Sequence, residues 1–180
     1  MILLVPPAVS PEVQETHSRL DQMRATGYGI LDIIKASQLL DETWEFVRTG
    51  QNWDSYWILW QLCSQAEYPG YLFGPEVPDS AEWQWSRMKM FYDPLPALKK
   101  VTCPVLALFG EEDLLVSTKL SRPLMEKALR EAGNTDFEMH TMPGVGHNLS
   151  DSDDLPLHRK TGRGDRGYSM IAEWVGARFR

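Results

Sequence analysis

The sequence has few cysteines, no long apolar run and no excess of basic side chains, and each shortage excludes a class of protein. Two cysteines, Cys63 and Cys103, are too few for a disulfide framework and have no metal-ligand spacing, which favours a reducing, cytoplasmic location. No run is long enough to span a membrane, and the apolar start at Met1 is too short and too uncharged for a signal segment. The net charge of −7 argues against nucleic acid as a partner, because phosphates are bound by clustered Lys and Arg.

The composition is that of an ordinary globular protein. The chain has 180 residues, of which 43% are apolar and 24% are charged, and this is enough for one core. Apolar runs predict strands within residues 2–5 and 101–109, and residues 137–142 are predicted to form a third strand. Apolar residues at helical spacing predict helices over residues 11–27, 30–48, 53–63, 81–91, 117–132 and 168–179. Pro123 fits its helix only near the first turn.

Two segments rich in proline and glycine are expected to be irregular: a loop over residues 68–79 and a turn-rich connector over 93–98. The order of elements then predicts an α/β fold, with about three parallel strands and a helical segment inserted between the first two. We divide the chain into a first strand and turn (1–10), a helical cap or lid (11–92) and an α/β core segment (93–180). Three parallel strands leave an edge unpaired beside residues 2–5, and this edge suits pairing with another chain. A buried strand at the first residue is expected equally for a piece of a longer protein and for a protein with a short first strand.

An acid and a histidine each follow one of the predicted strands. Asp113 comes after Gly110-Glu111-Glu112, and His147 comes after Gly144-Val145-Gly146. The carboxyl ends of neighbouring parallel strands meet at one edge of the sheet, so we expect these two side chains within hydrogen-bond reach. A carboxylate beside an imidazole suits general base catalysis near neutral pH. Taken alone, Asp113 could be a solvated loop acid and His147 an unpartnered loop histidine; the pairing favours the catalytic interpretation.

Most of the tryptophans fall within the predicted cap. Six of the seven lie there: Trp44, Trp53, Trp57, Trp60, Trp83 and Trp85. Trp57, Trp60 and Trp83 are the candidates for lining an apolar substrate pocket. The alternative is that a small helical subdomain needs these rings for its own core. No motif predicts a cofactor or a metal ion.

The segments Pro104–Asp113 (PVLALFGEED) and Pro143–His147 (PGVGH) resemble the C-terminal part of α/β-hydrolases. The group in question is the serine aminopeptidases and prolyl-oligopeptidase-like esterases and peptidases, to which the connector Tyr92–Leu98 is also similar. The resemblance covers residues 2–179. It implies that the three strands are the sixth, seventh and eighth of the family's sheet, and that residues 6–91 form its cap. It also implies that Asp113 is the acid and His147 the base of a catalytic triad.

The chain departs from that family at the nucleophile. No Gly-x-Ser-x-Gly elbow occurs in it, and the serines weighed as replacements, Ser10, Ser64, Ser117 and Ser150, all lack the elbow. The sequence therefore predicts a C-terminal segment of a serine hydrolase that cleaves an ester or amide through an acyl-enzyme. Such a segment supplies acid and base but no nucleophile, and alone it is weakly active or inactive.

Two alternatives stay open. One is a non-catalytic hydrolase-like binding module whose cap binds a hydrophobic partner, and the other is one half of a hydrolase assembled from two chains. For the hydrolase interpretation, the expected partner is a small-molecule or peptide substrate with an apolar part. Neither nucleic acid nor a membrane is an expected partner.

Overall fold

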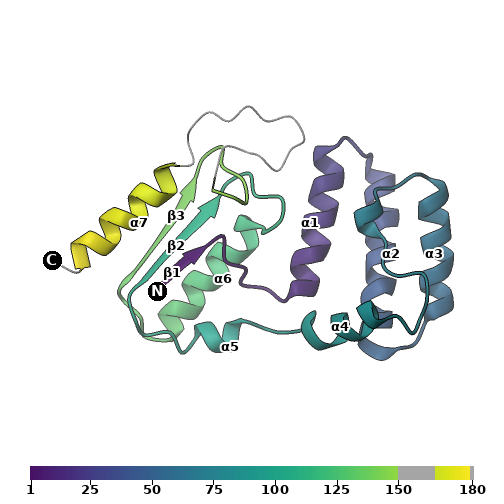
Figure 1. Ribbon diagram of the computed structural model, residues 1–180, viewed down its shortest axis with the longest axis horizontal. Coiled ribbons are helices and arrows are strands. Elements are labelled where there is room, and N and C mark those ends of the chain that lie inside the picture. The colour runs from purple at the N-terminus through teal and green to yellow at the C-terminus, as the bar shows by residue number, and fades with distance from the viewer. Residues whose placement is uncertain (150–164, 179–180) are drawn as a thin grey trace. The chain divides into compact units, whose positions relative to one another are not determined.

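The computed structural model describes residues 1–149 and 165–178, so Ser150 and Phe179 lie outside the described residues. The chain divides into two compact units (Figure 1). The first, here called the sheet unit, comprises Met1–Val9 and Asp93–Arg180, and the second, here called the helical unit, comprises Ser10–Tyr92. Each unit is described separately below.

The sheet unit is built on a parallel sheet. In the described part of the chain it has three strands, β1 (Ile2–Leu4), β2 (Val105–Gly110) and β3 (Phe137–Met142), in the spatial order β1-β2-β3. Both pairings are parallel, and β2 runs in register with β3 from Val105 opposite Phe137 to Gly110 opposite Met142. The predicted α/β class, the three parallel strands and the helical insertion between the first two strands are confirmed.

The central strand β2 is buried along its whole length. Its alternate side chains enter two separate apolar clusters, one shared with helix α6 (Thr118–Glu131) and the other with helix α7 (Asp165–Arg178). A parallel strand covered on both faces must be apolar at every position. This is why the run at 105–109 identifies the strand so clearly in the sequence.

The helical unit packs around its own core. Its elements are α1 (Pro11–Ala25), α2 (Ile30–Thr49), α3 (Trp53–Gln65), the short 3-10 helix η1 (Gly70–Leu72) and α4 (Ala81–Lys89). Leu39, Leu40 and Phe46 of α2, together with Tyr56 of α3 and Trp83 of α4, are buried in one cluster. Ser80 begins α4, and its Oγ accepts a hydrogen bond from the amide of Trp83.

Four details differ from the sequence-based prediction. The first strand was expected to be buried, but Ile2 and Leu4 of β1 are exposed, because only β2 pairs with it in the described part of the chain. The connector contains a single-turn helix, α5 (Leu95–Leu98), and η1 lies within the predicted loop. Pro123 lies inside α6, in its second turn, where it cannot donate to the carbonyl of Lys119. The helix nevertheless continues to Glu131, because its apolar face, which includes Met125 and Leu129, is buried against β2.

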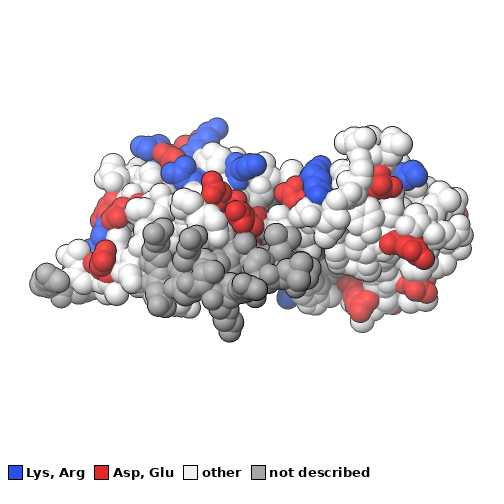
Figure 2. All heavy atoms as spheres, turned by 90° about the horizontal axis from the view of Figure 1, so that it is seen from above, with Lys and Arg blue, Asp and Glu red and all other residues white. Residues whose placement is uncertain are grey.

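Surface properties add two observations. Among residues 1–149 and 165–178, no helix combines the length and apolarity that a membrane span requires. On the face drawn in Figure 2, basic and acidic side chains of the described residues are interspersed and form no broad basic field.

Candidate active site

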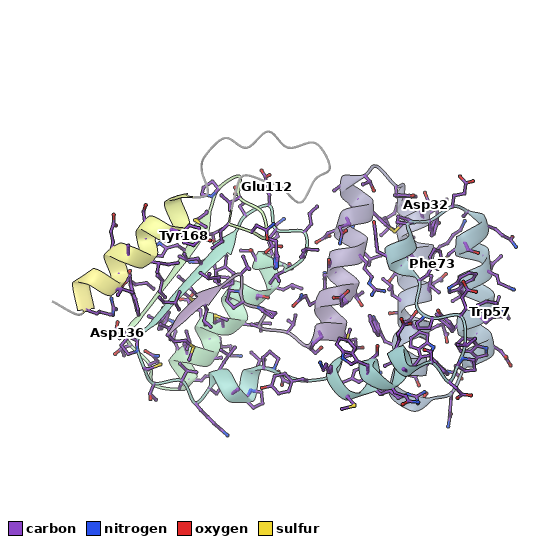
Figure 3. The ribbon with its side chains drawn as sticks, in the orientation of Figure 1. Asp32, Trp57, Phe73, Glu112, Asp136 and Tyr168 are labelled. Atoms are coloured by element: carbon purple, nitrogen blue, oxygen red, sulfur yellow. The ribbon has the colours of Figure 1, made fainter. Side chains whose placement is uncertain are left out.

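Asp113 lies just beyond the carboxyl end of β2, with its side chain almost fully buried at 1% exposed. Its Oδ1 atom accepts hydrogen bonds from the backbone amides of Leu115 and Val116, both at 2.8 Å. An Asp that accepts from amides two and three residues further on is a common turn-forming arrangement. The carboxylate is therefore fixed by its own loop before any other side chain is considered. Glu112, labelled in Figure 3, marks this end of the sheet.

His147 supplies the second side chain of the site. Its Nδ1 atom is 3.1 Å from Oδ2 of Asp113, and its side chain is 31% exposed. The contact between these two residues predicted from the sequence is present. Each oxygen of the Asp113 carboxylate thus has at least one hydrogen-bond partner, as a buried anion requires.

The turn between β3 and His147 explains how the two side chains meet. Because β2 and β3 are parallel neighbours, their carboxyl ends lie side by side, and Gly110 is opposite Met142. The chain then turns at Gly144, which has a φ of 67°, a left-handed conformation that favours glycine. The amide of Glu112 donates to the carbonyl of Val145 at 3.0 Å, which holds the turn against the end of β2.

This geometry suits general acid–base chemistry. An imidazole that donates from Nδ1 to a carboxylate is fixed in one tautomer, in which Nε2 is the basic nitrogen. The carboxylate also stabilises the imidazolium that forms when Nε2 takes up a proton. A buried carboxylate with three donors meets this requirement, because its own orientation is set independently of the histidine.

Sequence reasoning missed two parts of this site. The first is the pair of backbone amides at Leu115 and Val116; the tendency of Asp to accept from amides two and three residues ahead was the available signal. The second is Glu111, whose Oε2 accepts a hydrogen bond from the amide of Gly144 at 3.2 Å. In the sequence, Glu111 is indistinguishable from a solvated loop acid.

Of the four serines considered as nucleophiles, the three within the described residues lie on a helix or directly before one. Ser10 precedes α1, Ser117 precedes α6, and Ser64 lies on α3, where its Oγ donates to the carbonyl of Gln61. Ser117 is separated from β2 by residues 111–116, so it does not stand on a sharp strand-to-helix turn. These three positions therefore lack the strained elbow that exposes a nucleophilic serine.

The tryptophans proposed as substrate contacts differ in burial. Trp57 (labelled in Figure 3) and Trp60, on α3, are half-buried and stacked with ring centroids 4.8 Å apart. The ring centroids of Trp60 and Phe73 are 5.2 Å apart. Trp83 is only 2% exposed, and its Nε1 donates to the carbonyl of Val77. Its ring meets Phe46 edge to face in the core of the helical unit. Of the three rings, Trp57 and Trp60 are the two that keep a larger exposed surface.

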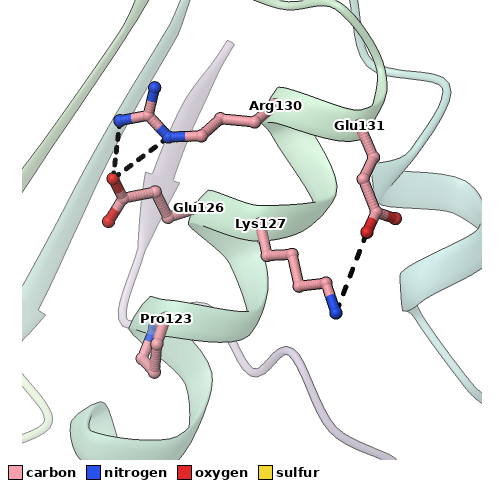
Figure 4. A pocket seen from close by; sticks show the side chains of 5 residues that line it. All are labelled: Pro123, Glu126, Lys127, Arg130 and Glu131. Atoms are coloured by element: carbon pink, nitrogen blue, oxygen red, sulfur yellow. Dashed lines mark hydrogen bonds and ion pairs between the residues drawn. The ribbon is translucent and has the colours of Figure 1, made fainter.

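Neither the Cys63 thiol nor a hollow on α6 adds a catalytic group. Burial raises the pKa of the Cys63 thiol, which keeps it protonated and a poor nucleophile. A hollow of about 450 Å³ on the outer side of α6 is lined by charged side chains and Pro123 (Figure 4). All four of those charges are in ion pairs: Glu126 with Arg130 at 2.7 Å, and Glu131 with Lys127 at 3.9 Å. Glu131 also contacts Lys99 at 2.9 Å. This hollow is a surface feature of one helix and has no convergent catalytic groups.

Comparisons with known proteins found a similarity among solved structures but none among protein families or curated proteins. No protein-family model matches the chain, and no curated protein matches it. Among solved structures, the chain is similar to MenH from S. aureus with a TM-score of 0.39 and 15% sequence identity. The alignment covers 98% of this chain and 58% of the MenH chain, so this chain spans little more than half of that protein's length. A similarity of this size does not show which family the chain belongs to.

Proposed function

We propose that this chain supplies the acid, Asp113, and the base, His147, of a serine-hydrolase site whose nucleophile lies outside these 180 residues. The complete site hydrolyses an ester or an amide through an acyl-enzyme. His147 takes the proton of the attacking serine and returns it to the leaving group, and Asp113 stabilises the imidazolium. The observation that carries the proposal is the 3.1 Å contact between Nδ1 of His147 and a buried carboxylate at the carboxyl end of the neighbouring strand.

The helical unit has the role of a lid in this proposal. Its half-buried Trp57 and Trp60 offer an apolar, aromatic surface to a substrate with an apolar part. Trp83 lies in the core of the same unit, where it packs against Phe46 and Tyr56. The substrate class that follows is a small ester, amide or peptide with an apolar group.

The first experiment uses the chain as it is. Incubated with a fluorophosphonate probe, the 180-residue protein should show no labelling above a heat-denatured control, because the nucleophile is missing. Robust labelling at a serine of this chain, abolished by His147→Ala, would instead identify an internal nucleophile and overturn that part of the proposal.

The second experiment supplies the nucleophile. The DNA adjoining the Met1 codon is read for a Gly-x-Ser-x-Gly elbow, and the elbow-bearing segment is expressed with this chain, in frame or as a separate polypeptide. Labelling at the elbow serine should appear, vanish with His147→Ala, and fall about 10⁴-fold with Asp113→Asn. His140→Ala is the matched control, since His140 lies on β3 beside Glu138 and should leave labelling unchanged.

One observation favours a different function. Within residues 1–149 and 165–178, β1 pairs only with β2, and its Ile2 and Leu4 are 37% and 44% exposed. Met1 and Val5 bond to β2, so the backbone groups of the two exposed residues point away from it. An apolar edge of this kind fits a non-catalytic module that binds another chain by strand pairing. That alternative requires that no Gly-x-Ser-x-Gly elbow be encoded next to this chain. It also predicts that Leu4→Lys dissociates the assemblies detected by analytical sedimentation, whereas His147→Ala leaves them intact.

A further inference from the structure

The end of β2 and the turn before His147 lie so close together that there is no room for a side chain at Gly110. A Cβ atom added at Gly110 would be 2.4 Å from the carbonyl oxygen of Val145 and 2.6 Å from that of Gly146. Both obstacles are backbone atoms, which cannot rotate aside as the end of a flexible side chain can. The turn can therefore keep its place only if residue 110 is glycine.

Hydrogen bonds beside Gly110 hold the same turn. The amide of Glu111 donates to the carbonyl of Met142, and the amide of Glu112 to that of Val145, both at 3.0 Å. The Glu111 side chain adds a third bond, from the amide of Gly144 to Oε2 at 3.2 Å. These contacts continue the pairing of β2 with β3 beyond both strands, as far as the residues directly before His147.

The distance between Asp113 and His147 depends on this junction. Asp113 is fixed by its own loop, whereas His147 directly follows the turn that Gly110 and Glu111 hold in place. We propose that Gly110 and Glu111 are positioning residues that set the Asp113–His147 hydrogen bond. This inference rests on the proposed function and deepens it, because it names residues that act on the acid–base pair without touching substrate.

The test reads the hydrogen bond directly, by nuclear magnetic resonance of the full chain labelled with [¹⁵N]histidine. The signal of the His147 Nδ1 proton, identified by its loss in His147→Ala, should exchange slowly with water in the unmodified protein. Gly110→Ala should accelerate that exchange about tenfold or more, since the bond is made to a charged acceptor. Gly176→Ala is the matched control, because a Cβ added at Gly176 in α7 meets no atom within 4 Å, and exchange should stay unchanged.

Variants of Glu111 provide a second test, which remains informative if Gly110→Ala does not fold. Glu111→Gln keeps an oxygen that can accept from the Gly144 amide, so exchange should stay within about twofold of the unmodified protein. Glu111→Ala removes the acceptor, and exchange should accelerate about threefold. Equal rates in Glu111→Ala and the unmodified protein would overturn the role of Glu111, and an unchanged rate in folded Gly110→Ala would overturn that of Gly110.

Asp113→Asn separates this inference from the proposed function. The single oxygen of the substituted amide side chain must serve the two backbone amides, which turns its NH₂ group toward His147 and removes the acceptor. If Asp113→Asn leaves the Nδ1 proton unchanged, the acid–base pair is not coupled and the proposed function fails. If Asp113→Asn alters the proton while Gly110→Ala and Glu111→Ala do not, the pair stands and only the positioning inference fails.

Discussion

The carboxylate of Asp113 accepts a hydrogen bond from the backbone amide of Val116 at 2.8 Å, within its own loop. The same oxygen also accepts from Leu115, and the other oxygen contacts His147. The acid is therefore a structural element of the loop as well as a partner of the histidine. A change at this position should alter stability together with chemistry.

Asp113→Ala should lower the free energy of unfolding by about 2–4 kcal/mol, because it leaves two amides without their acceptor and removes the partner of His147. Urea denaturation of the full chain measures the effect. Glu112→Ala is the control: its side chain is exposed, and its loss should change stability by less than about 0.5 kcal/mol. Equal losses in the two variants would contradict the loop-forming role of Asp113.

Gly74→Ala should destabilise the protein by about 1–3 kcal/mol through overpacking. A Cβ at this position would come within 3.0 Å of two atoms of the Trp83 ring, which is buried and has little room to move. Gly70→Ala, in the same segment, meets no atom within 4 Å and should be nearly neutral. Thermal unfolding compares the two, and a Gly74→Ala protein as stable as Gly70→Ala would show that the ring can shift.

Trp83→Ala should cost about 3–5 kcal/mol, because it empties a large volume in the core of the helical unit. Trp57→Ala should cost about 1 kcal/mol, since that ring is only half-buried. Urea denaturation again gives both values. If the order of the two effects were reversed, Trp57 would be the ring that supports the core, and its proposed contact with substrate would lose its basis.

Stability should fall as the pH rises above about 10. Burial raises the pKa of Tyr56 and of Tyr68 above the ordinary value for tyrosine, and for Tyr68 the hydrogen bond to Asp32 adds to the rise. The unfolded chain therefore releases these protons near pH 10, whereas the folded chain retains them. Their contribution to stability is complete below that pH and is lost progressively above it.

Urea midpoints measured between pH 8 and pH 11 test this expectation. Tyr68→Phe removes one of the two groups, so its midpoint should decline less steeply with pH than that of the unmodified protein. A decline of the same slope in both proteins would exclude Tyr68 as a source of the alkaline sensitivity.

The central strand β2 and the Asp113–His147 contact could be predicted from the sequence on physical grounds. A parallel strand buried on both faces leaves an unbroken apolar run, as at 105–109, and neighbouring parallel strands place their carboxyl ends together. Two residues that each follow such a strand must then lie close in space. The sequence order of acid and histidine was enough to find the pair.

The burial of the tryptophans and the continuation of α6 past Pro123 could not be predicted in the same way. Helical spacing tells which residues share a face of a helix. That Trp83 is more deeply buried than Trp57 depends on packing between α2, α3 and α4. Pro123 was expected near the first turn because proline lacks an amide proton. Tertiary contacts of α6 with β2 outweigh that local loss, and they are invisible in the local sequence.

Because β2 and β3 are parallel neighbours, the geometry of the acid–base pair does not depend on the number of residues that connect the two strands. Helix α6 leaves one end of the sheet and returns to the other, and the residues that follow it, 132–136, lie at the end remote from Asp113 and His147. A few extra residues inserted there would lengthen a distant loop and leave Gly110 opposite Met142. Homologous chains can therefore vary in this connection, whereas any insertion between Gly110 and Asp113 would shift the carboxylate out of reach of the imidazole.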